Sequence, residues 1–362
     1  MWAGSRVQRR ARLGSRGRDS GATPARPRSP PSFPPGSPLQ GSLFYGTCNL
    51  PACDTLEFAS YDLATGATTD LFDFPLDSFD DGYVADNALY NDSVVISLQY
   101  DSAPDVGYLV TFNLTTNALI SGRNSTPCFG LWPDVDAPST TLLCLALVPA
   151  SAKCPPTTTS QCTQLLRIDR ATGAETLLAS FLPDYAPFTV EALDAARGVV
   201  YSTFELLSGG TPELITLDAR TGAVLNTAPF PYTLAFLEFE VSAARGGRVY
   251  AVVQDGAHPG GTVAYAGTVD TATATATPLG PKAYFNVSFP PATGGFFNQF
   301  NTISTLSDEL GVFFSTAFHY EIPSPPADPI LHLIGNSLDD GSLVYDEVVK
   351  NPFCEILWIP TA

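Results

Sequence analysis

The sequence predicts an all-β protein, a six-bladed β-propeller made of four-stranded antiparallel blades. One observation is a repeated phrase: an apolar run, then Asp, two variable residues, Thr and Gly, then a second apolar run. Its copies end, in chain order, at Gly66, Asn117, Gly173, Gly222, Ala274 and Gly341. The other observation is their spacing, about fifty residues in most intervals, which is enough for four strands. Radial repetition of four-stranded sheets is how a propeller protects its sheet edges.

Each phrase predicts the hairpin between the third and fourth strands of a blade. Asp and Thr side chains bond nearby backbone amides, and Gly supplies the positive φ at which the chain reverses. Asn117 replaces Gly in the second copy, and Asn tolerates the left-handed conformation best after Gly. A second pair of apolar runs precedes the phrase, as at 188–204 and 239–253. These runs predict the hairpin between the first and second strands.

The two ends of the chain determine the blade count. Residues 43–47, 56–62 and 67–72 supply only three strands, because a Pro-rich segment precedes them. Near the other end, the apolar run 353–359 has no partner in its own repeat. We therefore expect this run to complete the first blade, which gives six blades in all. The alternative is seven blades, with the additional one inside the long interval 275–341.

Charge divides the chain into a leader, residues 1–40, and a body, residues 41–362. The leader holds eight arginines against one acid, for a net charge of +7, and the body has a net charge of −25. The leader is rich in Arg, Pro and Ser and is predicted to be disordered. It fits either an organelle transit peptide or a non-native stretch from a misplaced start codon. The body is predicted to be a single propeller domain, whose acidity argues against nucleic acid as a partner.

Cysteines and glycosylation sequons indicate the compartment. The predicted disulfides are Cys48–Cys53, Cys154–Cys162 and Cys128–Cys144, and Cys354 is left free or intermolecular. The sequons, all expected in turns or connections, are at Asn91, Asn113, Asn124 and Asn286. These features favour the secretory pathway or the extracellular space. The alternative is an organelle lumen reached through a transit peptide. The longest strongly apolar run, 142–150, is about half of the ~20 residues that a membrane span needs, so no span is predicted.

The Asp-x-x-Thr-Gly hairpins resemble those of the quinoprotein-like and surface-layer-type β-propeller superfamily, across roughly residues 43–360. This resemblance implies a fold and not an activity. Quinoprotein dehydrogenases typically carry a Trp a few residues after the Gly. Here the residues after Gly66, Gly173 and Gly222 read Ala-Thr-Thr, Ala-Glu-Thr and Ala-Val-Leu, which argues against pyrroloquinoline quinone as a cofactor.

No catalytic residues are predicted. The chain has no Gly-x-Ser-x-Gly elbow, no phosphate-binding loop and no dinucleotide fingerprint, and its three histidines are not at metal-ligand spacing. Six-bladed propellers also include metal-dependent lactonases, which hold a divalent cation in the central channel. Aligning the inner strands on Val135, Leu193 and similar apolar residues gives a candidate set for a cation such as Ca²⁺. The set is Asn87, Asp134 and Glu240.

These observations predict a secreted or surface-displayed propeller that serves as a binding or scaffolding module. Loops between the second and third strands of a blade, and between blades, emerge on one face and are expected to bind a protein or a carbohydrate. The candidate residues on this face are Phe318, His319, Tyr320, Tyr284, Phe285 and Phe296. The alternative is that these rings have a purely structural role and only cover the ends of the blades. The alternative function is a lactonase-like, metal-dependent hydrolase, and the oligomeric state is left open.

Overall fold

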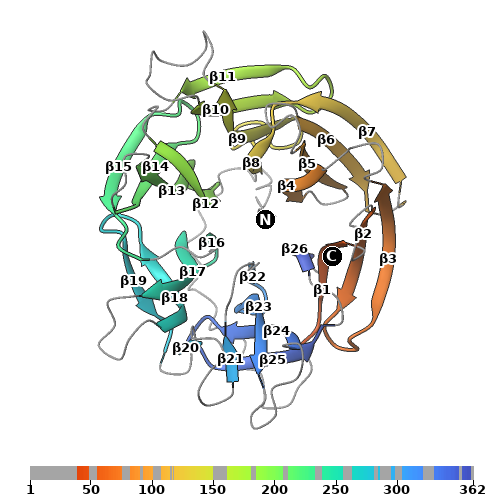
Figure 1. Ribbon diagram of the computed structural model, residues 1–362, viewed down its shortest axis with the longest axis vertical. Coiled ribbons are helices and arrows are strands. Elements are labelled where there is room, and N and C mark those ends of the chain that lie inside the picture. The colour runs from red at the N-terminus through yellow and green to blue at the C-terminus, as the bar shows by residue number, and fades with distance from the viewer. Residues whose placement is uncertain are drawn as a thin grey trace, which may run out of the picture.

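The fold is a ring of six antiparallel sheets around a central axis, a six-bladed β-propeller (Figure 1). The computed structural model describes residues 39–48, 55–75, 82–89, 93–100, 107–114, 116, 118–149, 161–180, 185–206, 211–232, 239–255, 263–280, 284–285, 295–297, 304–320, 330–349 and 353–359. Among them there is no helix that is long and apolar enough to span a membrane. The predicted fold class and blade number are confirmed.

Each blade has four main strands, which we call A to D from the axis outward. Blade 1 contains β26 (Phe353–Ile359), β1 (Ser42–Cys48), β2 (Thr55–Asp62) and β3 (Thr68–Pro75). Blade 2 contains β4 (Gly82–Leu89), β5 (Ser93–Tyr100), β6 (Gly107–Asn113) and β7 (Ala118–Ser125). Blade 3 contains β8 (Cys128–Pro133), β9 (Thr141–Pro149), β10 (Gln161–Asp169) and β11 (Glu175–Ser180).

The other three blades follow in chain order. Blade 4 contains β12 (Tyr185–Asp194), β13 (Val199–Leu206), β14 (Glu213–Asp218) and β15 (Val224–Pro229). Blade 5 contains β16 (Phe239–Ser242), β17 (Arg248–Asp255), β18 (Val263–Asp270) and β19 (Thr275–Pro278), with β20 (Tyr284–Phe285) paired to β18. Blade 6 contains β22 (Ser304–Ser307), β23 (Val312–Tyr320), β24 (Ile330–Ser337) and β25 (Leu343–Val348), with β21 (Gly295–Phe297) paired to β23. The length of the interval 275–341 therefore includes two added strands and not a seventh blade.

The ring closes as predicted, because β26 pairs antiparallel with β1. Trp358 of β26 is buried, and its ring stacks on Phe314 of blade 6 with centroids 6.1 Å apart. The backbone N–H of Trp358 donates to Thr305 Oγ1 at 3.0 Å. The closing strand is thus paired with β1 in its own blade, and it is both packed on and hydrogen-bonded to blade 6.

The C–D hairpins form as the repeated phrase predicts. In blade 4, Asp218 Oδ1 accepts the hydroxyl and the backbone N–H of Thr221, both at 2.8 Å. Gly222 follows with φ of 70°. These two hydrogen bonds, that of the hydroxyl being the stronger cause, hold the pKa of Asp218 below its usual range. Ala274, which stands where blade 5 has lost its glycine, adopts a φ of 55° and so keeps the same turn.

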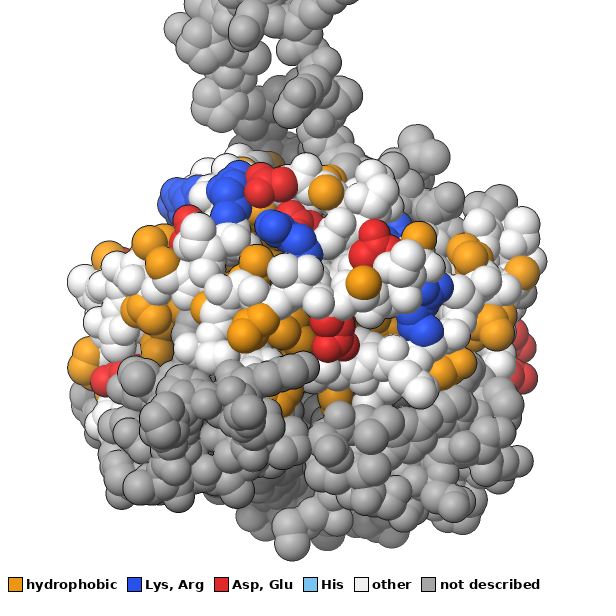
Figure 2. Space-filling model, turned by 90° about the horizontal axis from the view of Figure 1, so that it is seen from above, with side chains coloured by type: hydrophobic (Ala, Val, Ile, Leu, Met, Phe, Trp, Pro, Cys, Tyr) orange, Lys and Arg blue, Asp and Glu red, His pale blue; other side chains and the backbone are white. Residues whose placement is uncertain are grey.

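The outer strands share an irregularity that the sequence did not predict. In five blades the D strand has one residue more than its partner strand. The additional residue comes five positions after the turn residue in blades 1 and 3, and three positions after it in blades 2, 4 and 6. The additional residues are Leu71, Ile120, Leu178, Leu225 and Val344. A bulge twists an edge strand and hinders its pairing with another sheet. The bulge residues Ile120 and Leu225 are exposed apolar side chains of the outer strands. Figure 2 shows apolar side chains on the rim.

A disulfide joins the two inner strands of blade 3. Cys128 of β8 and Cys144 of β9 are bonded, and both residues are fully buried. This confirms one predicted pair. Cys162 is also disulfide-bonded, while Cys53, Cys154 and the side chains of Cys48 and Cys354 lie outside the described residues, so their predicted states stay predictions.

The two sequons whose asparagines are described occupy different settings. Asn113 is the last residue of β6, where it begins the C–D hairpin as expected. Asn124 lies inside β7 and not in a connection, because this strand continues past the predicted turn to Ser125. Asn91 and Asn286 lie outside the described residues.

Candidate functional site

The two faces of the ring are built from different connections. The A–B and C–D hairpins emerge on one face, and the B–C and D–A connections emerge on the other. The D–A connections, in chain order, are residues 76–81, 126–127, 181–184, 230–238, 279–303 and 349–352. The fifth is far longer than the others and contains both added strands. We call residues 279–303 the insertion.

The insertion adds one short strand to each of two neighbouring sheets. In blade 5, Tyr284 of β20 lies opposite Tyr265 of β18. In blade 6, Phe296 of β21 lies opposite His319 of β23, which places it among the last residues of that strand. Both pairings lie at the B–C end of their blades, and β20 and β21 approach each other (Figure 1).

This pairing brings together the predicted binding-face residues along the backbone of blades 5 and 6. Tyr284 and Phe285 form β20, Phe296 lies in β21, and 318–320 are the end of β23. Their side chains lie outside the described residues. These residues were predicted to lie in loops. Their strand pairing was not predicted, since strands of two or three residues leave no periodic pattern.

The three candidate metal ligands come from three different blades. Asn87 is in β4, Asp134 directly follows β8, and Glu240 is in β16, and the side chain of Asn87 is outside the described residues. Asp134 is fully buried and forms an ion pair with Arg167. Within the described part of the chain, no three acidic, His or Cys side chains cluster closely enough to hold a metal ion. The metal site stays a prediction.

The inner-strand alignment behind that set was wrong in blades 2 and 3. In blade 2, Leu89 and not Ala88 is level with Leu193. The N–H of Asp134 donates to the Thr141 carbonyl at 2.9 Å and so closes the A–B hairpin, as the pairing of Asp194 with Val199 does in blade 4. In blade 3, Pro133 and not Val135 is therefore the residue equivalent to Leu193 of blade 4. The alignment of blade 3 failed because its A–B hairpin is unusually long, and the apolar Val135 was taken for part of the strand.

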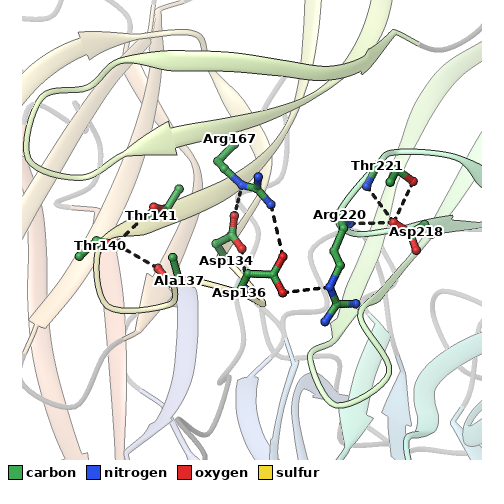
Figure 3. Close-up of polar contacts among 9 residues, drawn as sticks. All are labelled: Asp134, Asp136, Ala137, Thr140, Thr141, Arg167, Asp218, Arg220 and Thr221. Carbon is green, nitrogen blue, oxygen red and sulfur yellow. Dashed lines mark hydrogen bonds and ion pairs between the residues drawn. The ribbon is translucent and has the colours of Figure 1, made fainter.

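The best-defined polar site is a ladder of ion pairs on the A–B/C–D face (Figure 3). Arg167 of β10 pairs with Asp134 and lies 3.9 Å from Asp136 Oδ2. The other oxygen of Asp136 accepts from Arg220 Nε at 2.9 Å. Arg220 belongs to the C–D hairpin of blade 4, next to Asp218, so the ladder ties blade 4 to the A–B hairpin of blade 3.

Arginines also link blade 4 to blade 5, and blade 5 to blade 6. Arg197 of blade 4 donates to the carbonyls of Gly246 and Gly247 in the A–B hairpin of blade 5. Arg245 of that hairpin pairs with Asp339 of blade 6 at 2.7 Å. All seven basic residues that the structure describes are arginines. Figure 2 shows basic and acidic side chains gathered near the upper edge of the rim. These ion pairs and hydrogen bonds link neighbouring blades on this face. The arginines that form them, Arg167, Arg197, Arg220 and Arg245, all have partners within the protein.

Comparison with known proteins supports the fold alone. No protein-family model matches the sequence, and no curated protein matches it. TolB from Acinetobacter baumannii has a TM-score of 0.50 and 13% identity over 89% of this chain and 67% of that one. The periplasmic gluconolactonase PpgL of Pseudomonas aeruginosa has a TM-score of 0.49 and 10% identity, covering 89% of this chain and 99% of that one. The β-propeller domain of the Trilobed protease from Pyrococcus furiosus has a TM-score of 0.43 and 9% identity, covering 83% of this chain and 79% of that one. Similarity to β-propellers is thus confirmed, while the quinoprotein-like superfamily stays a prediction.

Proposed function

We propose that this protein is a binding module of the secretory pathway that holds its ligand with the insertion on the B–C/D–A face. The observation that carries the proposal is the addition of β20 and β21 to two neighbouring sheets at the same end. Binding residues often lie on loops that a rigid scaffold positions. Here the opposite face supplies the rigidity through its interblade ion pairs.

The residues of the insertion indicate the chemistry of the ligand. Tyr284, Phe285, Phe296 and the adjoining 318–320 are aromatic apart from one histidine. Aromatic side chains offer a large flat apolar surface, and Tyr adds a polar tip. Such a set suits sugar rings or the apolar side chains of an extended peptide. The net charge of −25 on the body disfavours polyanions, including nucleic acids.

The buried Cys128–Cys144 disulfide supports the compartment. Disulfides form and persist in oxidising environments such as the secretory pathway and the extracellular space. A pair sealed inside blade 3 must form before or during folding, so the body has to fold where thiols can be oxidised. Non-reducing peptide mapping of the protein from its native source tests this. A linked Cys128–Cys144 pair agrees with the proposal, whereas free thiols and import into a reducing organelle would overturn it.

Binding is tested with arrays of defined oligosaccharides and defined peptides, followed by calorimetric titration of each hit. We expect Phe296→Ala and His319→Ala each to weaken binding at least tenfold. Val224→Ser is the matched control, because Val224 is an exposed apolar residue on the outer rim of blade 4. Hits whose affinity the two insertion variants leave unchanged would place the binding site elsewhere and refute the proposal.

A further inference from the structure

The sequon at residues 124–126 is displayed on the surface of the folded protein. Asn124 is an exposed residue of β7, the outermost strand of blade 2. Asn113, by contrast, is half-buried, and its Oδ1 accepts the N–H of Thr116 at 2.8 Å in the C–D hairpin. Of these two sequons, the one at Asn124 leaves room for a large substituent.

A tyrosine ring lies next to Asn124 on the same face of the sheet. Tyr108 of β6 is the direct cross-strand partner of Asn124, and such partners project their side chains to the same side. Gly122 is two residues before Asn124, so it belongs to this face as well. A Cβ at Gly122 would lie 2.6 Å from the Tyr108 hydroxyl and 2.8 Å from ring atom Cε1. The ring therefore lies along β7, in the space that a side chain at 122 would fill.

This face borders the seam between blades 1 and 2. Phe112, on the same side of β6 as Tyr108, stacks on Phe72 of blade 1 with ring centroids 3.6 Å apart. Leu119 pairs with Phe112 and is 57% exposed. Apolar side chains thus line the contact between blades 1 and 2 as far as the outer rim, and Tyr108 and Leu119 are the outermost of them.

We propose that Asn124 carries an N-linked oligosaccharide whose first sugar packs on Tyr108 and covers the outer end of this seam. The proposal rests on the secretory compartment proposed above. The Asn124 Nδ2 forms a bond to the anomeric carbon of an oligosaccharide supplied by a lipid diphosphate donor. Nδ2 gives up one proton, and the lipid diphosphate leaves. The C–H face of the sugar then covers the aromatic ring and removes apolar area from water.

The test begins with glycopeptide mapping of the full chain from its native source. We expect Asn124 to be occupied. An unmodified Asn124 beside a modified Asn91 or Asn286 would overturn this proposal and leave the secretory proposal standing. Four bare sequons together with free thiols would overturn both.

The role of the ring is tested by removing the glycan enzymatically from secreted protein. Loss of the packed sugar is expected to lower the Tm of the wild type by about 2 °C. Tyr108→Leu keeps the sequon and an apolar side chain but removes the ring, so its Tm should change by less than half as much. Thr126→Ser keeps the sequon and serves as the control that should behave as the wild type. Equal Tm losses in Tyr108→Leu and the wild type would refute the packing of the sugar on Tyr108.

Discussion

The buried disulfide of blade 3 makes a quantitative prediction about stability. Replacing both Cys128 and Cys144 by Ala removes a cross-link between residues 16 positions apart in the chain. A loop of this size restricts the unfolded chain by about 3 kcal/mol in free energy. Because both residues are fully buried, the smaller alanines also leave unfilled space, which adds to the loss. We therefore expect the double variant to lose at least 3 kcal/mol.

Urea unfolding of the wild type and the double variant, followed by tryptophan fluorescence, measures this loss. Without reductant the midpoint of the variant should be lower by the equivalent of about 3 kcal/mol or more. With reductant present through the transition, the two proteins should come within about 1 kcal/mol of each other, because the wild type then unfolds to an equally unrestricted chain. The native wild type should resist reductant in the absence of urea, since neither sulfur is accessible. Equal midpoints without reductant would refute the reasoning.

Three further predictions concern a turn glycine, an aspartate and a metal. Gly222→Ala should lower the stability by about 3 kcal/mol, because its φ of 70° strains any side chain and the new Cβ would collide with Ala179. Gly246→Ala is the control: at φ 72° with open space around it, it should lower the stability by only about 1–2 kcal/mol. Equal losses of stability in urea unfolding would contradict this account. The lowered pKa of Asp218 means that its stabilising effect is present above its ordinary value of 3.8 and is lost as pH falls through the lower pKa of the folded state. The stability gap between wild type and Asp218→Asn should therefore be larger at pH 7 than at pH 3, and a constant gap would argue against it. Adding CaCl₂ or a chelator should shift the Tm by less than 1 °C, whereas a calcium-dependent rise that Glu240→Gln abolishes would favour the lactonase-like alternative.

The parts of the fold that sequence could predict are those specified locally. The Asp218–Thr221–Gly222 turn contains its own hydrogen-bond donors, acceptor and positive φ, so its sequence alone identifies the hairpin. The closing strand was predictable for a different reason, because the run 353–359 is strand-like and its repeat offers it no partner. Blade number follows from these two features together.

What the sequence could not provide is the pairing of distant side chains. Arg220 reaches Asp136, 84 residues earlier in the chain, and no local pattern encodes such a contact. The same is true of the candidate binding site. Its aromatic residues could be identified from the sequence, but the pairing of Tyr284 with Tyr265 and of Phe296 with His319 depends on which blades the ring makes adjacent. The metal set depended on the level of each inner strand, and one long hairpin was enough to misplace blade 3.

The closure of the ring by β26 also sets an order of events during synthesis. β1 leaves the ribosome before the strands of blades 2 to 6, whereas its inner partner β26 is made after all of them. Until then the inner edge of β1 has unpaired backbone groups, and such an edge can pair with other chains. Blades 2 to 5 are complete earlier, as is all of blade 6. The nascent protein therefore passes through a long interval in which blade 1 lacks its inner strand, and this is the stage at which a molecular chaperone would be needed to protect the unpaired edge of β1.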